Sequence, residues 1–195
     1  MHHFKKVVYA ICIGAFGILP FSESSLAQIG IGAGLDIRSE DPTHGYGLRL
    51  EYRVVNLPPV ADLKIRAHGS YFSETKKSSY SVNGLVTDVF EEKSAFDIGA
   101  VLLAGINLGL VNPYAGVGLG VDSSEFGTAR SVSQPNRLRG VNEENFYWNL
   151  FFGGELSIIP YIKPFFEYRF VQLINPENID IKESERFSLG IIMRF

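Results

Sequence analysis

The last ten residues, RFSLGIIMRF at 186–195, alternate between apolar and other side chains up to the final residue. One face of this stretch is entirely apolar and carries Phe187, Leu189, Ile191, Met193 and Phe195. The opposite face carries Arg186, Ser188, Gly190, Ile192 and Arg194. A chain terminus normally frays into water, whereas a period of two indicates a β-strand with two different faces. The stretch therefore predicts a strand that extends to Phe195.

The same alternation recurs upstream, at about 28–38, 45–55, 62–72, 94–107, 113–122, 145–157 and 164–173. The connections between these segments alternate in length. The short ones are 56–61, 108–112 and 158–163, and the longer, polar ones are 73–93, 123–144 and 174–185, with 39–44 as a short exception. Tight turns at one end and long loops at the other are typical of outer-membrane barrels. The sequence predicts an all-β, transmembrane, antiparallel up-and-down β-barrel of about eight strands.

The first 27 residues have the three-part pattern of a secretory signal peptide. Lys5 and Lys6 precede an apolar run at 7–20, and a polar stretch then leads to small residues at Ser25 and Ala27. The apolar run is short for a membrane-spanning helix, although a retained anchor or a buried N-terminal helix is the alternative. We expect cleavage between Ala27 and Gln28, which leaves residues 28–195 as one barrel domain.

Composition excludes several classes of function. The chain has 18 Lys and Arg against 21 Asp and Glu, with no basic stripe, so nucleic acid is not an expected partner. Its one cysteine, Cys12, lies in the signal peptide, so the mature chain has no thiol chemistry. Its two histidines after the signal, His44 and His68, are far apart in the predicted strand order. We expect no metal and no cofactor.

Period two does not say which face of the barrel meets water, because a soluble barrel such as a lipocalin puts its polar face outward. Here the polar face is crowded with glycine, and its charges are acids balanced mainly by arginine, as in a narrow lumen of ion pairs. Asp97 and Asp122 also lie on this face. The residues predicted to form lumen ion pairs are Asp36, Arg38, Arg49, Glu51, Arg53, Lys64, Arg66, Glu155, Glu167, Arg169, Arg186 and Arg194. Among them, Glu51 is expected to pair with Arg66.

Aromatic residues on the apolar face cluster near the strand ends. The loop-end group comprises Tyr46, Tyr71, Phe96, Phe146, Trp148 and Phe187, and the turn-end group comprises Tyr52, Phe166, Tyr168 and Phe195. Two such girdles match the two lipid headgroup boundaries of a bilayer, where an aromatic ring with a polar edge is favoured. We therefore expect the apolar face to contact lipid.

The signal peptide, the segment 28–38 and the terminal aromatic strand make the chain resemble the small eight-stranded outer-membrane barrels of the OmpA and OmpX kind. The resemblance covers the mature chain in pattern and not in identical residues. It implies a bacterial outer-membrane location, surrounding lipid and a monomer. It also implies that Phe195, with Met193 and Phe187 in the same strand, forms the signal read by the barrel-assembly machinery. The sequence departs from OmpA because it has no C-terminal peptidoglycan-binding domain, so OmpX is the better match and cell-wall anchoring is not expected.

The expected function is structural or surface-interacting, without catalysis, with the lumen plugged by ion pairs and the extracellular loops as the candidate site for an unidentified ligand. One alternative is a narrow pore, and another is a soluble ligand-binding barrel. A third is a lipid A-modifying enzyme, because His68 and Ser70 resemble the His-x-Ser pair of outer-membrane lipid A deacylases. Two departures weaken that alternative. Tyr71 stands where those enzymes have asparagine, and the pair falls on the inward face instead of facing lipid.

Overall fold

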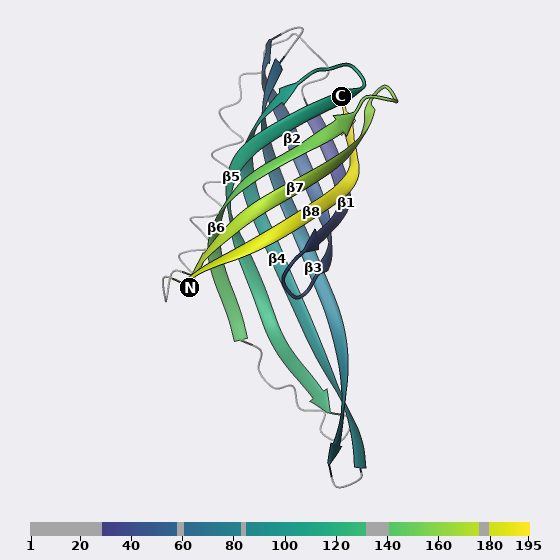
Figure 1. The fold of residues 1–195 in the computed structure, drawn as a ribbon, viewed down its shortest axis with the longest axis vertical. Coiled ribbons are helices and arrows are strands. Elements are labelled where there is room, and N and C mark those ends of the chain that lie inside the picture. The colour runs from purple at the N-terminus through teal and green to yellow at the C-terminus, as the bar shows by residue number, and fades with distance from the viewer. Residues whose placement is uncertain (1–28, 58–60, 83–84, 132–140, 176–179) are drawn as a thin grey trace.

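The computed structural model describes residues 29–57, 61–82, 85–131, 141–175 and 180–195, which form a closed barrel of eight antiparallel strands (Figure 1). Each strand pairs with its neighbours in the chain, and the last strand pairs with the first. The strands are β1 (Ile29–Arg38), β2 (His44–Leu57), β3 (Ala61–Val82), β4 (Leu85–Ile106), β5 (Val111–Ser131), β6 (Val141–Leu156), β7 (Ile162–Asn175) and β8 (Asp180–Arg194). The predicted all-β barrel is confirmed. The expected signal peptide and its cleavage site at Ala27 and Gln28 lie outside the described residues.

The two faces of the barrel wall differ in the way the alternation predicted. Outward side chains are apolar and open to the surroundings, with Leu48 and Leu119 each 69% exposed. Inward side chains are charged and enclosed, with Arg66 and Glu167 each 0% exposed. A barrel with an apolar exterior and a polar interior requires lipid, not water, around it. The soluble-barrel alternative is therefore wrong.

No helix long and apolar enough to cross a membrane occurs in the part of the chain that the structure describes.

The predicted loop at 73–93 is instead a paired hairpin. Strands β3 and β4 remain in register from Ala61 opposite Ile106 to Val82 opposite Leu85, and Figure 1 shows them running past the other strands at the lower end of the view. The prediction of a loop was wrong because this part of the sheet lies in water and needs no apolar face toward lipid. Its sequence therefore lacks the strict alternation of apolar and polar residues that marks the other strands. Strand β5 likewise continues to Ser131, and β8 already begins at Asp180.

The outward row of side chains marks where the apolar band ends on the loop side. On β3 it changes from Tyr71 to Ser73, and on β4 from Phe96 to Ser94. Ser73 and Ser94 lie directly opposite each other, so the change falls at one level of the hairpin. The remainder of β3 and β4 lies beyond this band.

The seam between β1 and β8 explains why the alternation continues to the end of the chain. Phe195 N–H donates to the Ile29 carbonyl at 2.9 Å, and Ile29 N–H donates back at 3.4 Å. Higher in the seam Gly34 lies opposite Gly190, and a Cβ on Gly34 would be only 2.6 Å from the Leu189 carbonyl oxygen. Two glycines facing each other there leave room for the Phe165 ring inside the barrel.

One aromatic residue was assigned to the wrong girdle. Tyr168 lies opposite Phe187, which belongs to the loop-end group, and also opposite Phe152. Its ring is 4.8 Å from that of Phe170 and 5.5 Å from that of Phe152, centroid to centroid. The prediction of Tyr168 in the turn-end girdle is therefore wrong, because strand stagger around a barrel cannot be read from alternation within one strand.

Candidate functional site: the charged lumen

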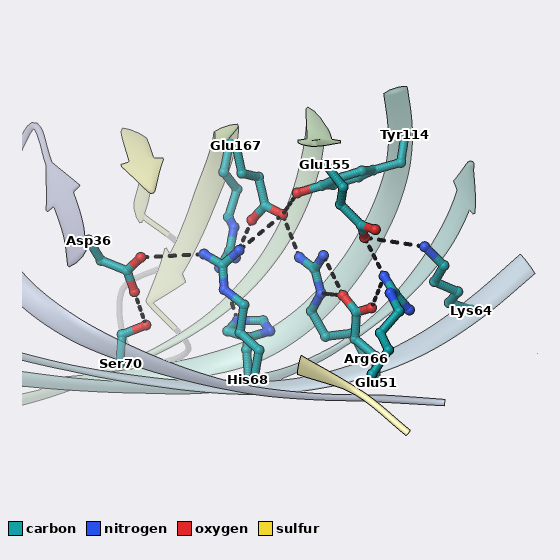
Figure 2. A network of polar contacts seen from close by, with 12 residues as sticks. Asp36, Glu51, Lys64, Arg66, His68, Ser70, Tyr114, Glu155 and Glu167 are labelled. Carbon is teal, nitrogen blue, oxygen red and sulfur yellow. Dashed lines mark hydrogen bonds and ion pairs between the residues drawn. The ribbon is translucent and has the colours of Figure 1, made fainter. Parts of the chain in front are cut away.

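Glu167 on β7 is the centre of the lumen and accepts hydrogen bonds from four side chains (Figure 2). Arg169 donates to Oε1 at 2.8 Å, while Tyr114 and Arg49 donate to Oε2 at 3.0 and 3.4 Å. Arg66 also donates to Oε2. Three guanidinium groups thus share one carboxylate that is completely enclosed, so each arginine needs a second acidic or aromatic partner.

Glu51 supplies the second carboxylate for Arg66. Arg66 Nε donates to Glu51 Oε1 at 2.7 Å, so the structure contains the pair that was predicted between these residues. Arg194 Nη2 donates to Glu51 Oε2 at 2.9 Å and also to Glu155. Lys64 Nζ then donates to Glu155 Oε1 at 3.3 Å. The network therefore continues without a break from Glu167 to the turn end of the barrel, as Figure 2 shows.

His68 and Ser70 face the lumen but have separate partners. The Ser70 hydroxyl donates to Asp36 Oδ2 at 2.6 Å. His68 Nε2 lies 2.9 Å from the Tyr147 hydroxyl and 3.0 Å from Arg169 Nη1. Both residues are buried. A serine nucleophile needs its hydroxyl proton to be accepted by the histidine, and here that proton is directed to a carboxylate instead.

Aromatic rings fill the space between the charges. The guanidinium carbon of Arg49 lies 4.1 Å from the centroid of Phe165, and that of Arg66 lies 5.3 Å from Tyr114 and 5.6 Å from Phe151. A cation over an aromatic face is attracted by the ring quadrupole, and more strongly when water is excluded. The lumen is thus packed with large side chains and not merely lined with charge.

A second cluster closes the loop end. Arg186 contacts Asp97 and donates to Asp122 Oδ2 at 2.9 Å, and Arg38 lies 3.4 Å from the same oxygen. The Phe72 ring lies beneath both guanidinium groups, at 4.5 Å from Arg38 and 5.8 Å from Arg186. Arg38 Nε also donates to the Pro42 carbonyl at 2.7 Å, which ties the β1–β2 turn across the mouth.

The closed barrel resembles solved outer-membrane proteins. Neisserial surface protein A has a TM-score of 0.54 at 14% identity, with 88% of this chain and 98% of that chain covered. The fold is that of a small outer-membrane β-barrel. The N-terminal barrel domain of Pseudomonas aeruginosa OprF has a TM-score of 0.52 at 12% identity, covering 88% of this chain and 100% of that chain. A major outer membrane protein of Thermus thermophilus has a TM-score of 0.52 at 13% identity with the same coverage.

At these identities the similarity of the outer-membrane barrel to its neighbours is one of fold. No protein-family model matches the sequence, and no curated protein matches it. The resemblance to small eight-stranded outer-membrane barrels is confirmed at this level. Together with the apolar exterior, it places the protein in a bacterial outer membrane with lipid against its outward face.

Eleven of the twelve residues predicted for lumen ion pairs are buried inside the outer-membrane barrel. The exception is Arg53 at the turn end, whose side chain is 19% exposed and whose Nε lies 3.6 Å from Asp62. Asp97 and Asp122 complete the loop-end pairs, although only their face had been predicted. Phe72 was not predicted to lie in the lumen. It could have been, because it follows Arg66 and His68 at every second position of the same strand and so falls on the same inward face. Met193, Phe187 and Phe195 face lipid, as the alternation predicted.

Outside the apolar band, the β1–β2 turn of the outer-membrane barrel is held to the β3–β4 hairpin. Asp41 accepts hydrogen bonds from Lys76 Nζ at 2.7 Å and Lys93 Nζ at 3.2 Å, and these bonds hold the pKa of Asp41 below its ordinary value. The Thr43 hydroxyl donates to Glu74 Oε2 at 3.2 Å. The turn thus lies against β3 at the loop-end mouth.

Proposed function

We propose that this outer-membrane barrel is a non-enzymatic protein with a structural or surface-interaction role, and that no solute passes through its lumen. The observation that carries this proposal is the ion-pair network from Lys64 to Arg186, with the Arg38–Phe72–Arg186 stack at its loop end. Eight strands leave a lumen that side chains can fill. A permeating solute would have to separate buried charge pairs, which costs several kcal/mol for each pair.

The surface-interaction part of the proposal is supported by the length of three neighbouring strands. Strands β3 and β4 contain 22 residues each and β5 contains 21. An apolar band of about 25 Å is crossed by roughly ten residues of a tilted strand. The remainder of these strands therefore forms a sheet beyond the apolar band, on the side of the long connections, which faces the cell exterior in outer-membrane barrels.

The environment of His68 and Ser70 supports the proposal that the protein is not an enzyme. Both face the enclosed lumen and not the lipid, and the Ser70 hydroxyl is bonded to Asp36. A lipid substrate on the outside of the barrel would have no route to this hydroxyl, because the wall strands β2, β3 and β4 pair continuously beside it.

Two further parts of the proposal concern assembly. The barrel is inserted by the barrel-assembly machinery through its last strand, and it functions as a monomer. The monomer is favoured because closure of β8 on β1 pairs every strand of the membrane-embedded wall and leaves no free edge there.

Two measurements, one on purified protein and one on cells, test whether the barrel is closed and non-enzymatic. In planar bilayers we expect no unitary conductance, and lipid A extracted from expressing cells should keep its mass. Regular single-channel conductance steps would refute the closed lumen. A change in lipid A mass that disappears with Ser70→Ala would refute the non-enzymatic role.

The surface role is tested with a shortened hairpin, in which residues 77–90 are replaced by Asn-Gly so that the pair Lys76–Glu91 is kept. A deletion strain is complemented with either form. Both forms should fold and resist detergent equally. If the hairpin interacts with a partner, only the full-length form should restore attachment or aggregation. Equal rescue of every phenotype by the shortened form would limit the role to envelope structure.

A further inference from the structure

The two ends of the lumen are closed to different extents. The loop end is sealed by Phe72 and two arginines, whereas the turn end contains a cavity of about 40 Å³ that is lined by Arg53, Lys64, Lys163, Asp62, Glu155 and Tyr114, among others. A single water needs roughly 10–15 Å³ on this measure. The cavity thus has room for a few waters or one small oxyanion. Two of its lining residues, Tyr114 and Glu155, also belong to the central network.

Positive charge is in excess around this cavity. Its two carboxylates are both shared, since Asp62 lies 3.6 Å from Arg53 and 3.3 Å from Lys64, and Glu155 contacts Lys64 and Arg194. Three cationic side chains, those of Arg53, Lys64 and Lys163, therefore line the cavity against two carboxylates.

Two of these cations have hydrogen-bonding capacity to spare. Lys163 Nζ donates to the Ser157 hydroxyl at 3.1 Å and forms no ion pair with any residue that the structure describes. Arg53 Nε is enclosed but makes no hydrogen bond. A lysine and an arginine whose donors converge on a small cavity are suited to an anion, because each hydrogen bond to the anion is charge-assisted.

We propose that the turn-end cavity binds a small oxyanion of the phosphate class from the periplasmic side, with Lys163 and Arg53 as its principal ligands and Lys64 as a third. The orientation follows from the short turns that surround the cavity, which face the periplasm in outer-membrane barrels. The phosphate belongs either to a free anion or to a phospholipid headgroup of the inner leaflet, since both present the same oxygens at this depth.

The site is tested by NMR on the full barrel in micelles of a maltoside detergent, which contains no phosphate. One arm adds inorganic phosphate and the other adds a short-chain phosphatidylglycerol, while chloride at equal ionic strength serves as the salt control. Backbone amide shifts of Gly105 and Lys163 report on occupancy. The variants are Lys163→Gln, Arg53→Gln and the conservative Lys163→Arg. Lys182→Gln at the opposite end of the barrel is the matched control.

We expect saturable shifts in the wild type, in Lys163→Arg and in Lys182→Gln. Affinity should fall roughly tenfold in Lys163→Gln and in Arg53→Gln, which corresponds to about 1.4 kcal/mol for one charge-assisted bond. Saturation in only one arm assigns the source of the phosphate. The proposal is overturned if neither arm saturates, if chloride reproduces the shifts, or if Lys163→Gln binds as the wild type does.

Discussion

Removing Glu51 should destabilise the barrel more than removing Glu51 together with Arg66. Glu51 accepts a charge-assisted bond from Arg66 at 2.7 Å and another from Arg194 at 2.9 Å, and all three side chains are buried. Each such bond contributes about 1.5–3 kcal/mol. Glu51→Ala should therefore cost roughly 3–5 kcal/mol of unfolding free energy, the range found when one partner of a buried pair is removed.

The double variant relieves part of this cost. Without Glu51, Arg66 loses its second carboxylate and keeps only Glu167. It already shares Glu167 with Arg49 and Arg169, so its charge is poorly compensated. Removing Arg66 as well leaves Glu167 with two arginines and Arg194 with Glu155. We expect Glu51→Ala with Arg66→Ala to recover about 1–3 kcal/mol of the loss, a coupling typical of residues in one network.

The assay is urea unfolding in liposomes, followed by the fluorescence of Trp148, the chain's single tryptophan, which faces lipid. The exposed pair Asp41 and Lys76 provides the matched control, because its Nζ–Oδ2 distance is also 2.7 Å. Variants of the control pair should have small and additive effects, since water solvates whichever charge remains. Small, additive effects at Glu51 and Arg66 too would refute the enclosed network.

Three other perturbations address the wall and the seam. Leu119→Arg places a charge in the lipid and should cost roughly 2–4 kcal/mol, whereas Thr75→Arg, beyond the apolar band, should leave urea unfolding almost unchanged. Deleting Phe195 removes its two hydrogen bonds to Ile29 and should lower the folded yield in outer-membrane fractions, so a wild-type yield would contradict this role. Gly118→Ala should lower the free energy of unfolding by about 1–3 kcal/mol, because the new Cβ would lie 2.7 Å from Asn149 Oδ1 and 2.9 Å from the Ala100 carbonyl oxygen. In the control Gly69→Ala the new Cβ has no atom nearer than 3.6 Å, so this variant should unfold as the wild type does.

The sequence could predict which side chains face the lumen and which face lipid, because a period of two holds where the strands cross the apolar band. Arg66 and Glu167 were placed inside the barrel on this basis alone, and both are completely buried. Glu51 and Arg66 could also be matched, because they belong to strands joined by a short turn and lie opposite each other.

Partners from distant strands could not be predicted. The contacts of Arg49 with Glu167 and of Arg194 with Glu155 depend on the stagger of the whole barrel, which no local pattern encodes. The β3–β4 hairpin beyond Ser73 was missed for a different reason. Its pairing is maintained in water, where neither face has to be apolar, so the signal used for the other strands is absent there.

The sequence distances in the lumen network have a consequence for how the barrel forms. Arg194 and Glu51 are 143 residues apart, Arg49 and Glu167 are 118 apart, and Arg66 and Glu167 are 101 apart. None of these pairs can form within a hairpin, and the Arg194–Glu51 pair bridges β8 and β2 on either side of β1. In an open sheet these charges remain hydrated, and they meet only when β8 reaches β1. Closure of the seam and dehydration of the interior are thus one late kinetic event, dominated by contacts of high sequence separation, which are the slow ones in folding.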